Sequence, residues 1–295
     1  MFSRRAFARA SLATVLASSF FGRRTRATEG GFGALAAQLA KIETESGGRL
    51  GVAVLDTESG AMVGHRADER FPMCSTFKML AAAAVLAKVD AGKEQLSRRI
   101  RVEQKDVLAY APMAAKRLGA DASLGELCDA AVTLSDNTAA NLILEQLGGP
   151  SAVTQFARSL GDETTRLDRN EPDVNEATPG DPRDTSTPAA MANDLKLLIA
   201  GNALSPASRD QLTAWLVGCK TGNATLRAGL PKSWRVGDKT GAGEHGTRND
   251  IAVIWPEGRK PLFVASYLTG AMTSDDARNA THAAVGRVVA GALAG

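Results

Sequence analysis

Cysteine and histidine are both scarce in this chain of 295 residues, with three of each. The cysteines form an odd set, so we expect buried free thiols and no disulfide framework. A chain of this length can build a core large enough to fold without disulfides. The histidines are scattered and show none of the short spacings typical of zinc ligands, so no metal or other cofactor is expected. The six residues are Cys74, Cys128, Cys219, His65, His245 and His282.

Acidic residues are missing from residues 1–27, which hold six of the 35 lysines and arginines. Without that segment the 32 acidic residues prevail, and the net charge changes from +3 to about −3. The remaining chain has no excess of positive charge for binding nucleic acid or anionic lipid. Repeats and low-complexity segments are also absent, and no later stretch approaches ~18 uninterrupted apolar residues, which argues against a transmembrane helix.

Residues 1–27 have the pattern of an export signal. A pair of arginines, Arg4 and Arg5, precedes an apolar stretch that is too short to span a bilayer. The adjacent arginines favour a twin-arginine signal over an ordinary secretory signal. Cleavage is expected near Ala27, and the absence of an early cysteine excludes a lipoprotein anchor. We therefore expect an exported mature protein that is not attached to a membrane.

Hydrophobic periodicity predicts strands near both ends of the chain and helices between them. Separated strands with short hairpin links indicate one antiparallel sheet, flanked by an N-terminal and a C-terminal helix. The expected fold class is α/β, of the α+β type, with an inserted all-α domain. Helices are expected at residues 32–44, 77–89, 123–130, 136–147, 150–160, 188–200, 206–217 and 274–293. Strands are expected at residues 50–55, 61–65, 234–238, 250–255 and 262–269.

This order of elements predicts two domains. Residues 28–65 and 215–295 would form a discontinuous α/β domain, and residues 66–214 would form a helical domain inserted into it. A cleft between two such domains is a common place for a functional site.

The first candidate motif is Ser75-Thr-Phe-Lys78, at the start of an apolar, alanine-rich helix. The spacing places Ser75 and Lys78 one turn apart on the same helix face. A serine hydroxyl needs a base within hydrogen-bond distance to act as a nucleophile, and a desolvated lysine can be that base. The alternative is a capping serine followed by a lysine whose amino group reaches solvent.

Two further polar motifs are Ser135-Asp-Asn137 and Lys239-Thr-Gly241. The first opens a predicted helix, where its side chains could either cap the helix or point into a cleft. The second ends a predicted strand, and the nearby glycines leave room for a ligand to approach the backbone. Each motif alone is also typical of an ordinary cap or turn.

A long segment without regular structure, residues 165–184, contains a fourth motif, Glu171-Pro-Asp-Val-Asn175. Loops of this length are usually functional or disordered. Glu171 and Asn175 could hold one water between them, and a carboxylate that takes a proton from such a water accelerates hydrolysis by roughly 10²–10⁴. The Glu171–Pro172 peptide bond can be cis at low cost.

Together and in this order, the four motifs resemble those of class A β-lactamases, and the resemblance extends from about Phe32 to the C-terminus. It implies a serine hydrolase that opens the β-lactam ring of penicillins and cephalosporins and gives antibiotic resistance. Ser75 would form an acyl-enzyme, which a water activated by Glu171 would hydrolyse. The Lys220-Thr-Gly-Asn-Ala224 stretch resembles that of cefotaxime-hydrolysing relatives. The resemblance further implies a periplasmic monomer without cofactors or nucleic-acid partners.

The resemblance also assigns roles to individual residues. Either Lys78 or Glu171 acting through water would be the acylation base, and Ser135 would relay a proton to the β-lactam nitrogen. The backbone N–H groups of Ser75 and Ala242 would form the oxyanion hole. Tyr110 would form an aromatic wall, or instead belong to the core. The predicted catalytic residues are Ser75, Lys78, Ser135 and Glu171. The predicted substrate-binding residues are Asn137, Asn175, Lys239, Thr240, Gly241, Ala242, Arg248 and Tyr110.

The segment 165–184 resembles the Ω-loop of this family. Arg169 and Asp184 fall where the family ties the neck of that loop, so we expect a partly buried ion pair and not a solvated charged loop. Some relatives pair the cysteine before the nucleophile with a cysteine at the position of Gly243. Cys74 lacks that partner here.

Three other functions share part of this pattern. A D-alanyl-D-alanine carboxypeptidase would have the first three motifs but would not need Glu171 and Asn175. A β-lactam receptor that signals after acylation would need a membrane-spanning helix or an attached cytoplasmic domain, and neither is expected here. A degenerate, non-catalytic relative is disfavoured because every motif residue is present.

Overall fold

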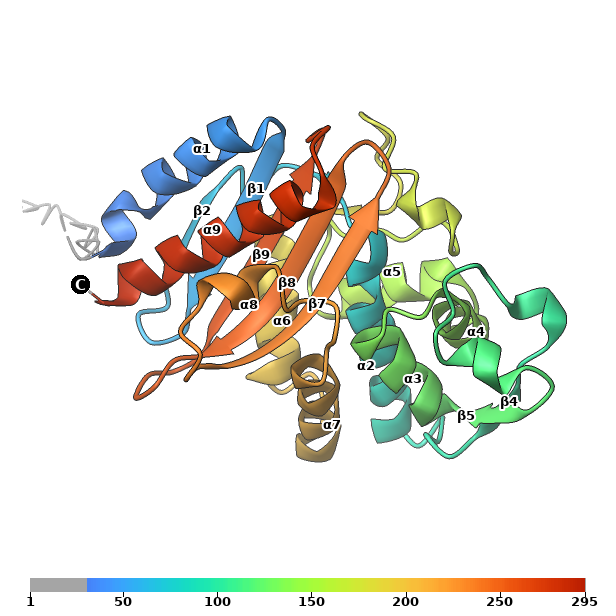
Figure 1. The fold of residues 1–295 in the computed structure, drawn as a ribbon. Helices are drawn as coiled ribbons and strands as arrows, with labels where there is room; N and C mark the ends of the chain where they lie inside the picture. Colours follow the sequence, from blue (N-terminus) through green and yellow to red (C-terminus); the bar gives the residue numbers. More distant parts are fainter. Residues whose placement is uncertain (1–30, 295) are drawn as a thin grey trace, which may run out of the picture.

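The structure is a computed structural model that describes residues 31–294, so the predicted export signal lies outside the described residues. Its centre is a five-stranded sheet with the strand order β2-β1-β9-β8-β7 (Figure 1). Every neighbouring pair is antiparallel, which confirms the predicted sheet. The strands are β1 (Arg49–Asp56), β2 (Met62–His65), β7 (Arg235–Gly243), β8 (Thr247–Trp255) and β9 (Leu262–Thr269).

Both faces of the sheet are buried under helices. Successive side chains of a strand point to opposite faces, so neighbouring residues belong to different apolar clusters. On one face, Val54 of β1 belongs to an apolar cluster with α1 (Leu35–Ser46) and α9 (Asp275–Ala294). On the other face, Leu55 belongs to a larger cluster that includes helices from the middle of the chain. In Figure 1 the blue α1 and the red α9 lie side by side along one face of the sheet. The predicted flanking by the N- and C-terminal helices is thus confirmed.

Helix α2 (Phe77–Asp90) is the central helix of the larger cluster. Every residue from Phe77 to Leu86 is buried, so α2 contacts its neighbours on all sides, as its apolar sequence predicts. It packs against α3, α4, α5 and α7. Within residues 31–294 no helix is both long enough and apolar enough to cross a bilayer. The remaining helices are α3 (Leu124–Thr133), α4 (Asn137–Leu147), α5 (Pro150–Ser159), α6 (Pro188–Ile199), α7 (Pro206–Val217) and α8 (Leu226–Gly229).

Two short strand pairs occur that the sequence pattern does not predict. A run of two or three residues is too short to show the alternation by which a strand is recognised. The 3₁₀ turns of the described residues, with three or four residues each, are also too short to be recognised from the sequence. The strand pairs are β3 (Phe71–Pro72) with β6 (Thr185–Ser186), and β4 (Arg99–Arg101) with β5 (Asp121–Ser123). The 3₁₀ turns are Gly31–Ala34, Cys74–Thr76, Gln104–Asp106, Ala114–Arg117 and Asp173–Asn175.

Strand β7 is longer than predicted and contains the whole Lys239-Thr-Gly241 motif. Glycine has low strand propensity, so the sequence pattern ends before the motif. The backbone nevertheless keeps pairing with β8, where Gly241 lies opposite Asn249 and Gly243 lies opposite Thr247. Because β7 is an edge strand of the sheet, its outer side is open to the helices that carry the other motifs.

Candidate active site

The four motifs meet at one cleft of about 310 Å³, beside the contact between β7 and the 3₁₀ turn that carries Ser75. Every lining residue except Thr221 is a site residue predicted from the sequence. The other three predicted residues, Lys78, Glu171 and Lys239, are buried close to it. The cleft is lined by Ser75, Tyr110, Ser135, Asn137, Asn175, Thr221, Thr240, Gly241, Ala242 and Arg248.

Ser75 lies in the 3₁₀ turn Cys74–Thr76, which continues directly into α2. The sheet holds this turn in place, because Asn249 of β8 donates to the two carbonyl oxygens just before it, at 2.8 and 3.0 Å. Cys74 has a φ of 45°, a left-handed conformation that is strained in a non-glycine residue and clusters at functional sites. The hydroxyl of Ser75 donates to Oε1 of Glu171 at 3.3 Å, so it faces a potential base.

Lys78 is fully buried one turn further along α2. Its Nζ donates to Glu171 Oε1 at 2.9 Å, to Asn137 Oδ1 at 2.6 Å and to the backbone oxygen of Ser135 at 2.9 Å. This burial contradicts the alternative of a lysine that reaches solvent. Burial lowers the pKa of Lys78, and the charge of Glu171 opposes that effect. The lowered pKa makes the neutral form, which can accept a proton, easier to reach than in an exposed lysine.

Glu171 is buried within the Ω-loop, with 4% of its surface exposed. Its Oε1 is shared by the Ser75 hydroxyl and the Lys78 ammonium. Its Oε2 accepts a hydrogen bond from Nδ2 of Asn175 at 2.5 Å, so these two residues are in direct contact. The Glu171–Pro172 peptide bond is cis, as predicted.

Asn141 of α4 holds the backbone of Glu171, and sequence reasoning missed it. Its Oδ1 accepts from the Glu171 N–H at 2.9 Å, and its Nδ2 donates to the Glu171 carbonyl oxygen at 2.9 Å. One feature of the sequence could have indicated that Asn141 belongs to the site. Asn141 follows Asn137 by four residues, so both amides lie on the same helix face, although asparagine is a poor residue for a helix interior.

Ser135 connects the two buried lysines. Lys239 Nζ donates to the Ser135 hydroxyl at 2.9 Å, and Lys78 Nζ lies 3.5 Å from the same oxygen. Ser135 itself has a φ of 59°, again in the left-handed region. Burial, together with the like charge of Lys78, lowers the pKa of Lys239 to about 7. The positive charge at this point therefore changes near neutral pH.

One wall of the cleft is suited to an anion. Thr240 and Thr221 bring their hydroxyl oxygens within 2.5 Å of each other, and Arg248 lines the same cleft. Lys239 lies buried directly before Thr240 on β7. Hydroxyls and cations together match the hydrogen-bonding needs of a carboxylate. For Thr221 the sequence had no signal beyond its place in the 220–224 stretch.

The glycines of β7 are required by packing as well as by ligand access. A Cβ atom at Gly241 would lie 2.8 Å from the Met73 carbonyl oxygen. One at Gly243 would lie 2.6 Å from Cys74 Sγ and 2.7 Å from the Asn175 carbonyl oxygen. All three distances are shorter than real contacts of a Cβ atom, so only glycine lets β7 lie this close to the nucleophile turn and the Ω-loop.

Tyr110 is 52% exposed at the rim of the cleft, which contradicts the alternative of a core tyrosine. Its loop is anchored by buried Asp136, whose Oδ2 accepts from the N–H groups of Met113 and Ala114, both at 2.9 Å. The other oxygen of Asp136 caps the first turn of α4. In addition, the N–H of Asn137 donates to the carbonyl oxygen of Tyr110 at 3.0 Å.

The neck of the Ω-loop is tied as predicted. Arg169 Nε lies 2.6 Å from Asp184 Oδ2, and the same guanidinium also pairs with Glu176. The carboxylate of Asp184 is 1% exposed and accepts from the N–H groups of Asp168 and Arg169. Its carbonyl oxygen accepts from the Met73 N–H at 2.9 Å, which joins the neck to the chain just before the nucleophile.

The three cysteines are free and buried, as predicted. Burial raises the pKa of the Cys74 thiol, so the reactive thiolate is disfavoured although the residue adjoins Ser75. Among the residues that the structure describes, no three histidine, cysteine or acidic side chains are grouped to hold a metal ion.

The fold and the cleft together are those of a serine hydrolase, and comparison with known proteins gives its family. The model of the Beta-lactamase enzyme family matches residues 34–293. Beta-lactamase CTX-M-97 of Escherichia coli is 52% identical over 252 residues, 85% of this chain and 87% of that protein. Beta-lactamase OXY-2 of Klebsiella oxytoca is 52% identical over 242 residues, which cover 82% and 83%.

Solved structures agree with these sequence matches. An ancestral (GNCA) class A β-lactamase is 64% identical, with a TM-score of 0.87, and the match covers 88% of this chain and 99% of that chain. The putative class A β-lactamase PenP from Rhodopseudomonas palustris is 59% identical, with the same TM-score and coverage. The chain therefore belongs to the class A β-lactamases, serine hydrolases that act on β-lactams and give antibiotic resistance.

Proposed function

We propose that the chain hydrolyses β-lactams through an acyl-enzyme on Ser75 that Glu171 and a water molecule then deacylate. One observation carries this proposal: Oε1 of Glu171 lies 3.3 Å from the Ser75 hydroxyl and 2.9 Å from Lys78 Nζ. A buried carboxylate so close to the nucleophile can receive a proton from a water that attacks the acyl carbon. Asn175 orients this carboxylate through its second oxygen.

Acylation needs a base for the Ser75 hydroxyl and an acid for the β-lactam nitrogen. The base is either Lys78, whose pKa is lowered by burial, or Glu171 acting through water. Ser135 returns the proton to the nitrogen as the ring opens, and its hydroxyl is oriented by Lys239. The N–H groups of Ser75 and Ala242 stabilise the oxyanion, a contribution of about 2.7–4 kcal/mol for each donor.

Substrate binding is assigned to the walls of the cleft. Lys239, Thr240 and Arg248 bind the substrate carboxylate, with Thr221 as a further hydroxyl in reach of Thr240. Asn137 donates to the acylamino side chain, while Tyr110 forms the outer wall. We expect penicillins and cephalosporins as substrates. Small changes in such a pocket shift preference by only about 1–3 kcal/mol, so this range is open to extension.

The organisation of the chain is proposed along the same lines. Residues 1–27 direct export to the periplasm, by a twin-arginine signal, and are removed near Ala27. The mature protein acts there as a monomer without a cofactor. Residues 28–65 and 215–295 form the α/β domain, and residues 66–214 form the helical domain with the Ω-loop at 165–184. The cleft residues come from both parts, which supports this division.

The direct test is turnover of benzylpenicillin by residues 28–295, with mass spectrometry of the Ser75 adduct. The proposal predicts many turnovers without a lasting adduct. A single burst followed by a stable acyl-enzyme would instead indicate a carboxypeptidase or a receptor. The direct contact between Glu171 and Asn175 disfavours both, since neither function needs a deacylating base.

A further inference from the structure

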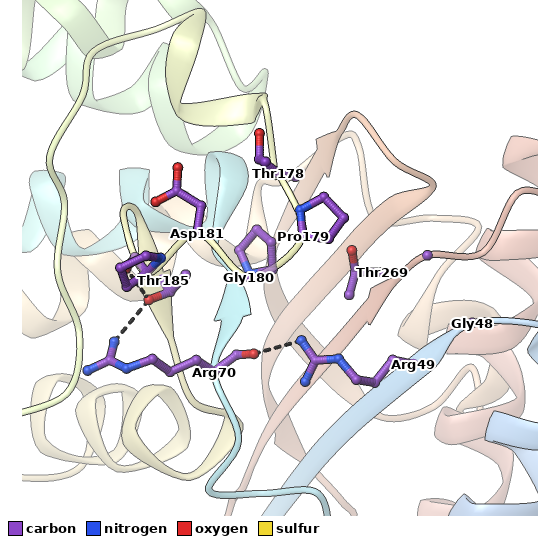
Figure 2. A pocket seen from close by; sticks show the side chains of 13 residues that line it. Gly48, Arg49, Arg70, Thr178, Pro179, Gly180, Asp181, Thr185 and Thr269 are labelled. Carbon is purple, nitrogen blue, oxygen red and sulfur yellow. Dashed lines mark hydrogen bonds between the residues drawn. The ribbon is translucent and has the colours of Figure 1, made fainter.

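A second cavity, larger than the catalytic cleft, lies under the returning arm of the Ω-loop, residues 177–182. Its volume is about 460 Å³, and it shares no lining residue with the catalytic cleft. Figure 2 shows it between this arm, the strand β3 and the adjoining ends of β1 and β9. Cavities that hold small organic ligands usually measure about 300–1,000 Å³, so the volume is sufficient for one.

Arg70 supplies a positive charge to this cavity that no acidic side chain among residues 31–294 neutralises through an ion pair. Its guanidinium donates to Thr185 Oγ1 at 2.9 Å, and no ion pair of Arg70 occurs within the described part of the chain. A guanidinium has five donors in a fork that fits a carboxylate, and the bond to Thr185 uses one of them.

The other charged groups at the cavity are already paired. Arg49 contacts Glu69 at 3.1 Å, donates to the Arg70 carbonyl oxygen at 2.8 Å and stacks 3.8 Å above the Phe71 ring. The carboxylate of Asp181 is held by two bonds from Arg183. Hence Arg49 does not draw an anion strongly away from Arg70, and the charge of Asp181, which would repel an anion, is offset by Arg183. The rest of the lining is largely uncharged, with apolar walls formed by Pro72, Ala177, Pro179 and Pro182.

We propose that this cavity binds small amphipathic carboxylates, with the carboxylate on Arg70 and the apolar part against the proline-rich walls. This inference does not depend on the proposed catalytic mechanism. It assigns a second site to the protein, away from the cleft in which β-lactams bind.

A ligand in this cavity would contact both chain segments that lead to the catalytic residues. Pro72 lies three residues before Ser75, and Ala177 lies two residues after Asn175. The cavity is formed by the Ω-loop in its docked position, so a ligand that fits it binds that position selectively. Such a ligand stabilises the docked loop increasingly as its free concentration rises above the Kd.

The site is tested by titrating ¹⁵N-labelled residues 28–295, which include every described residue, with 4-phenylbutyrate. Gly48, Gly180 and Gly270 line the cavity and supply three amide signals there. Gly241 and Ala242 line the catalytic cleft, and their amide signals report on it instead. We expect saturable shifts at the three cavity glycines at millimolar or lower ligand concentration. Shifts confined to Gly241 and Ala242 would overturn the proposal.

Two comparisons test the role of charge. The uncharged analogue 4-phenylbutan-1-ol has the same apolar part, and we expect it to bind at least about tenfold more weakly, because a hydrogen bond to a charged group is lost. Arg70→Gln should weaken 4-phenylbutyrate to a similar extent, whereas Arg70→Lys, which keeps the charge, should retain part of the affinity. Arg98→Gln removes the same charge from an exposed arginine that pairs with Glu94 and does not line the cavity, so it should change nothing.

Equal binding of the acid and the alcohol to the unsubstituted protein would overturn the assignment to carboxylates. So would unchanged affinity in Arg70→Gln. If Arg70→Gln does not fold, the comparison of acid with alcohol and the Arg70→Lys variant still decide the question.

Discussion

Two lysines that are buried side by side limit the pH range of this active site. Lys78 and Lys239 both contact the Ser135 hydroxyl, and both are fully buried. Burial disfavours the charged form of an amine, and each ammonium also disfavours the other. The structure thus holds its positive charge at an energetic cost, which a bound anion offsets. In the proposed mechanism, recognition of the substrate carboxylate therefore depends on the protonation of Lys239.

The first prediction concerns that protonation. Because the pKa of Lys239 is lowered to about 7, its charge is present below that pH and lost above it. We therefore expect kcat/KM for benzylpenicillin to fall as the pH rises through about 7, far below the usual lysine pKa near 10.4. A bound carboxylate restores the charge, so kcat should fall only at higher pH.

Steady-state profiles between pH 5.5 and 9.5 would measure this. Lys239→Arg, which stays charged throughout, should move the decline of kcat/KM to higher pH. A profile for the unsubstituted enzyme that stays flat to pH 9 would contradict the assignment of charge to Lys239.

A second residue-scale prediction concerns Asp194, which is 1% exposed on α6. Burial and the nearby Asp162 raise its pKa to about 9, although Arg158 opposes the shift. A buried acid whose pKa is higher in the folded than in the unfolded state lowers the stability of the protein as the pH rises. The unfolded chain releases the proton from about pH 4 upward, whereas the folded protein keeps it up to about pH 9. A tenfold difference in proton affinity between the folded and unfolded chain corresponds to about 1.4 kcal/mol. Asp194→Asn, which mimics the protonated acid, should therefore raise Tm at pH 8.

The same variant should gain progressively less as the pH is lowered toward 4, because the unfolded chain then also begins to bind the proton that the folded protein keeps on Asp194. Thermal unfolding at pH 4.5, 6 and 8 would test this. A gain that is equal at all three pH values, or a lower Tm at pH 8, would show that burial of the charge is not the cause.

At the scale of elements, the Ω-loop is held by its neck and by its centre. The neck is the ion pair of Arg169 with Asp184, and the centre is Glu171, whose backbone is held by Asn141. Both anchors are largely buried. The loop contains little regular structure, so these polar contacts and the buried side chains of Leu167 and Val174 hold its position.

Arg169→Ala should loosen the loop and slow deacylation. Breaking a buried pair costs about 3–5 kcal/mol, because Asp184 is left with an uncompensated charge. Rapid-quench measurement of deacylation and hydrogen exchange over residues 170–183 would test this. Arg166→Ala is the matched control, since its pair with Asp168 is more exposed and worth about 0–1 kcal/mol. Equal deacylation rates for the two variants would contradict the account.

The edge strand β7 supports a further prediction at Gly243. An added Cβ would lie 2.6 Å from Cys74 Sγ and 2.7 Å from the Asn175 carbonyl oxygen, so the Ω-loop or the nucleophile turn must move. Gly243→Ala should therefore lower both Tm and the deacylation rate. Gly291→Ala is the control, because no atom lies within 4 Å of its Cβ and alanine favours the α9 helix by roughly 0.5–1 kcal/mol. A Gly243→Ala enzyme as stable as Gly291→Ala would exclude the clash.

For the molecule as a whole, the sequence was sufficient for the main elements. Strands such as β1 and β9 are continuous apolar runs, because both sheet faces are covered by helices. Helix α2 could be predicted as buried from its alanine-rich sequence. The candidate site residues could be found because the chemistry restricts their types and spacing, and the fold brings them to one cleft.

Other features depend on contacts between distant segments, which no local pattern encodes. The pairing of β3 with β6 joins the nucleophile segment to the end of the Ω-loop across two residues only. The clamp by Asn141 and the hydroxyl of Thr221 become visible only when α4 and the 220–224 stretch are placed beside the cleft. The cavity beside Arg70 is likewise formed by four segments that are far apart in the chain.

The proposed mechanism requires Glu171 to deacylate an enzyme that Ser75 has acylated. It is tested most directly by reacting Glu171→Gln with benzylpenicillin and following the adduct by mass spectrometry. Glu163→Gln, a change of the same kind on an exposed side chain, is the control. We predict that Glu171→Gln accumulates a Ser75 acyl-enzyme that persists, while the control turns over like the unsubstituted protein. Rapid turnover without an adduct in Glu171→Gln would contradict the account.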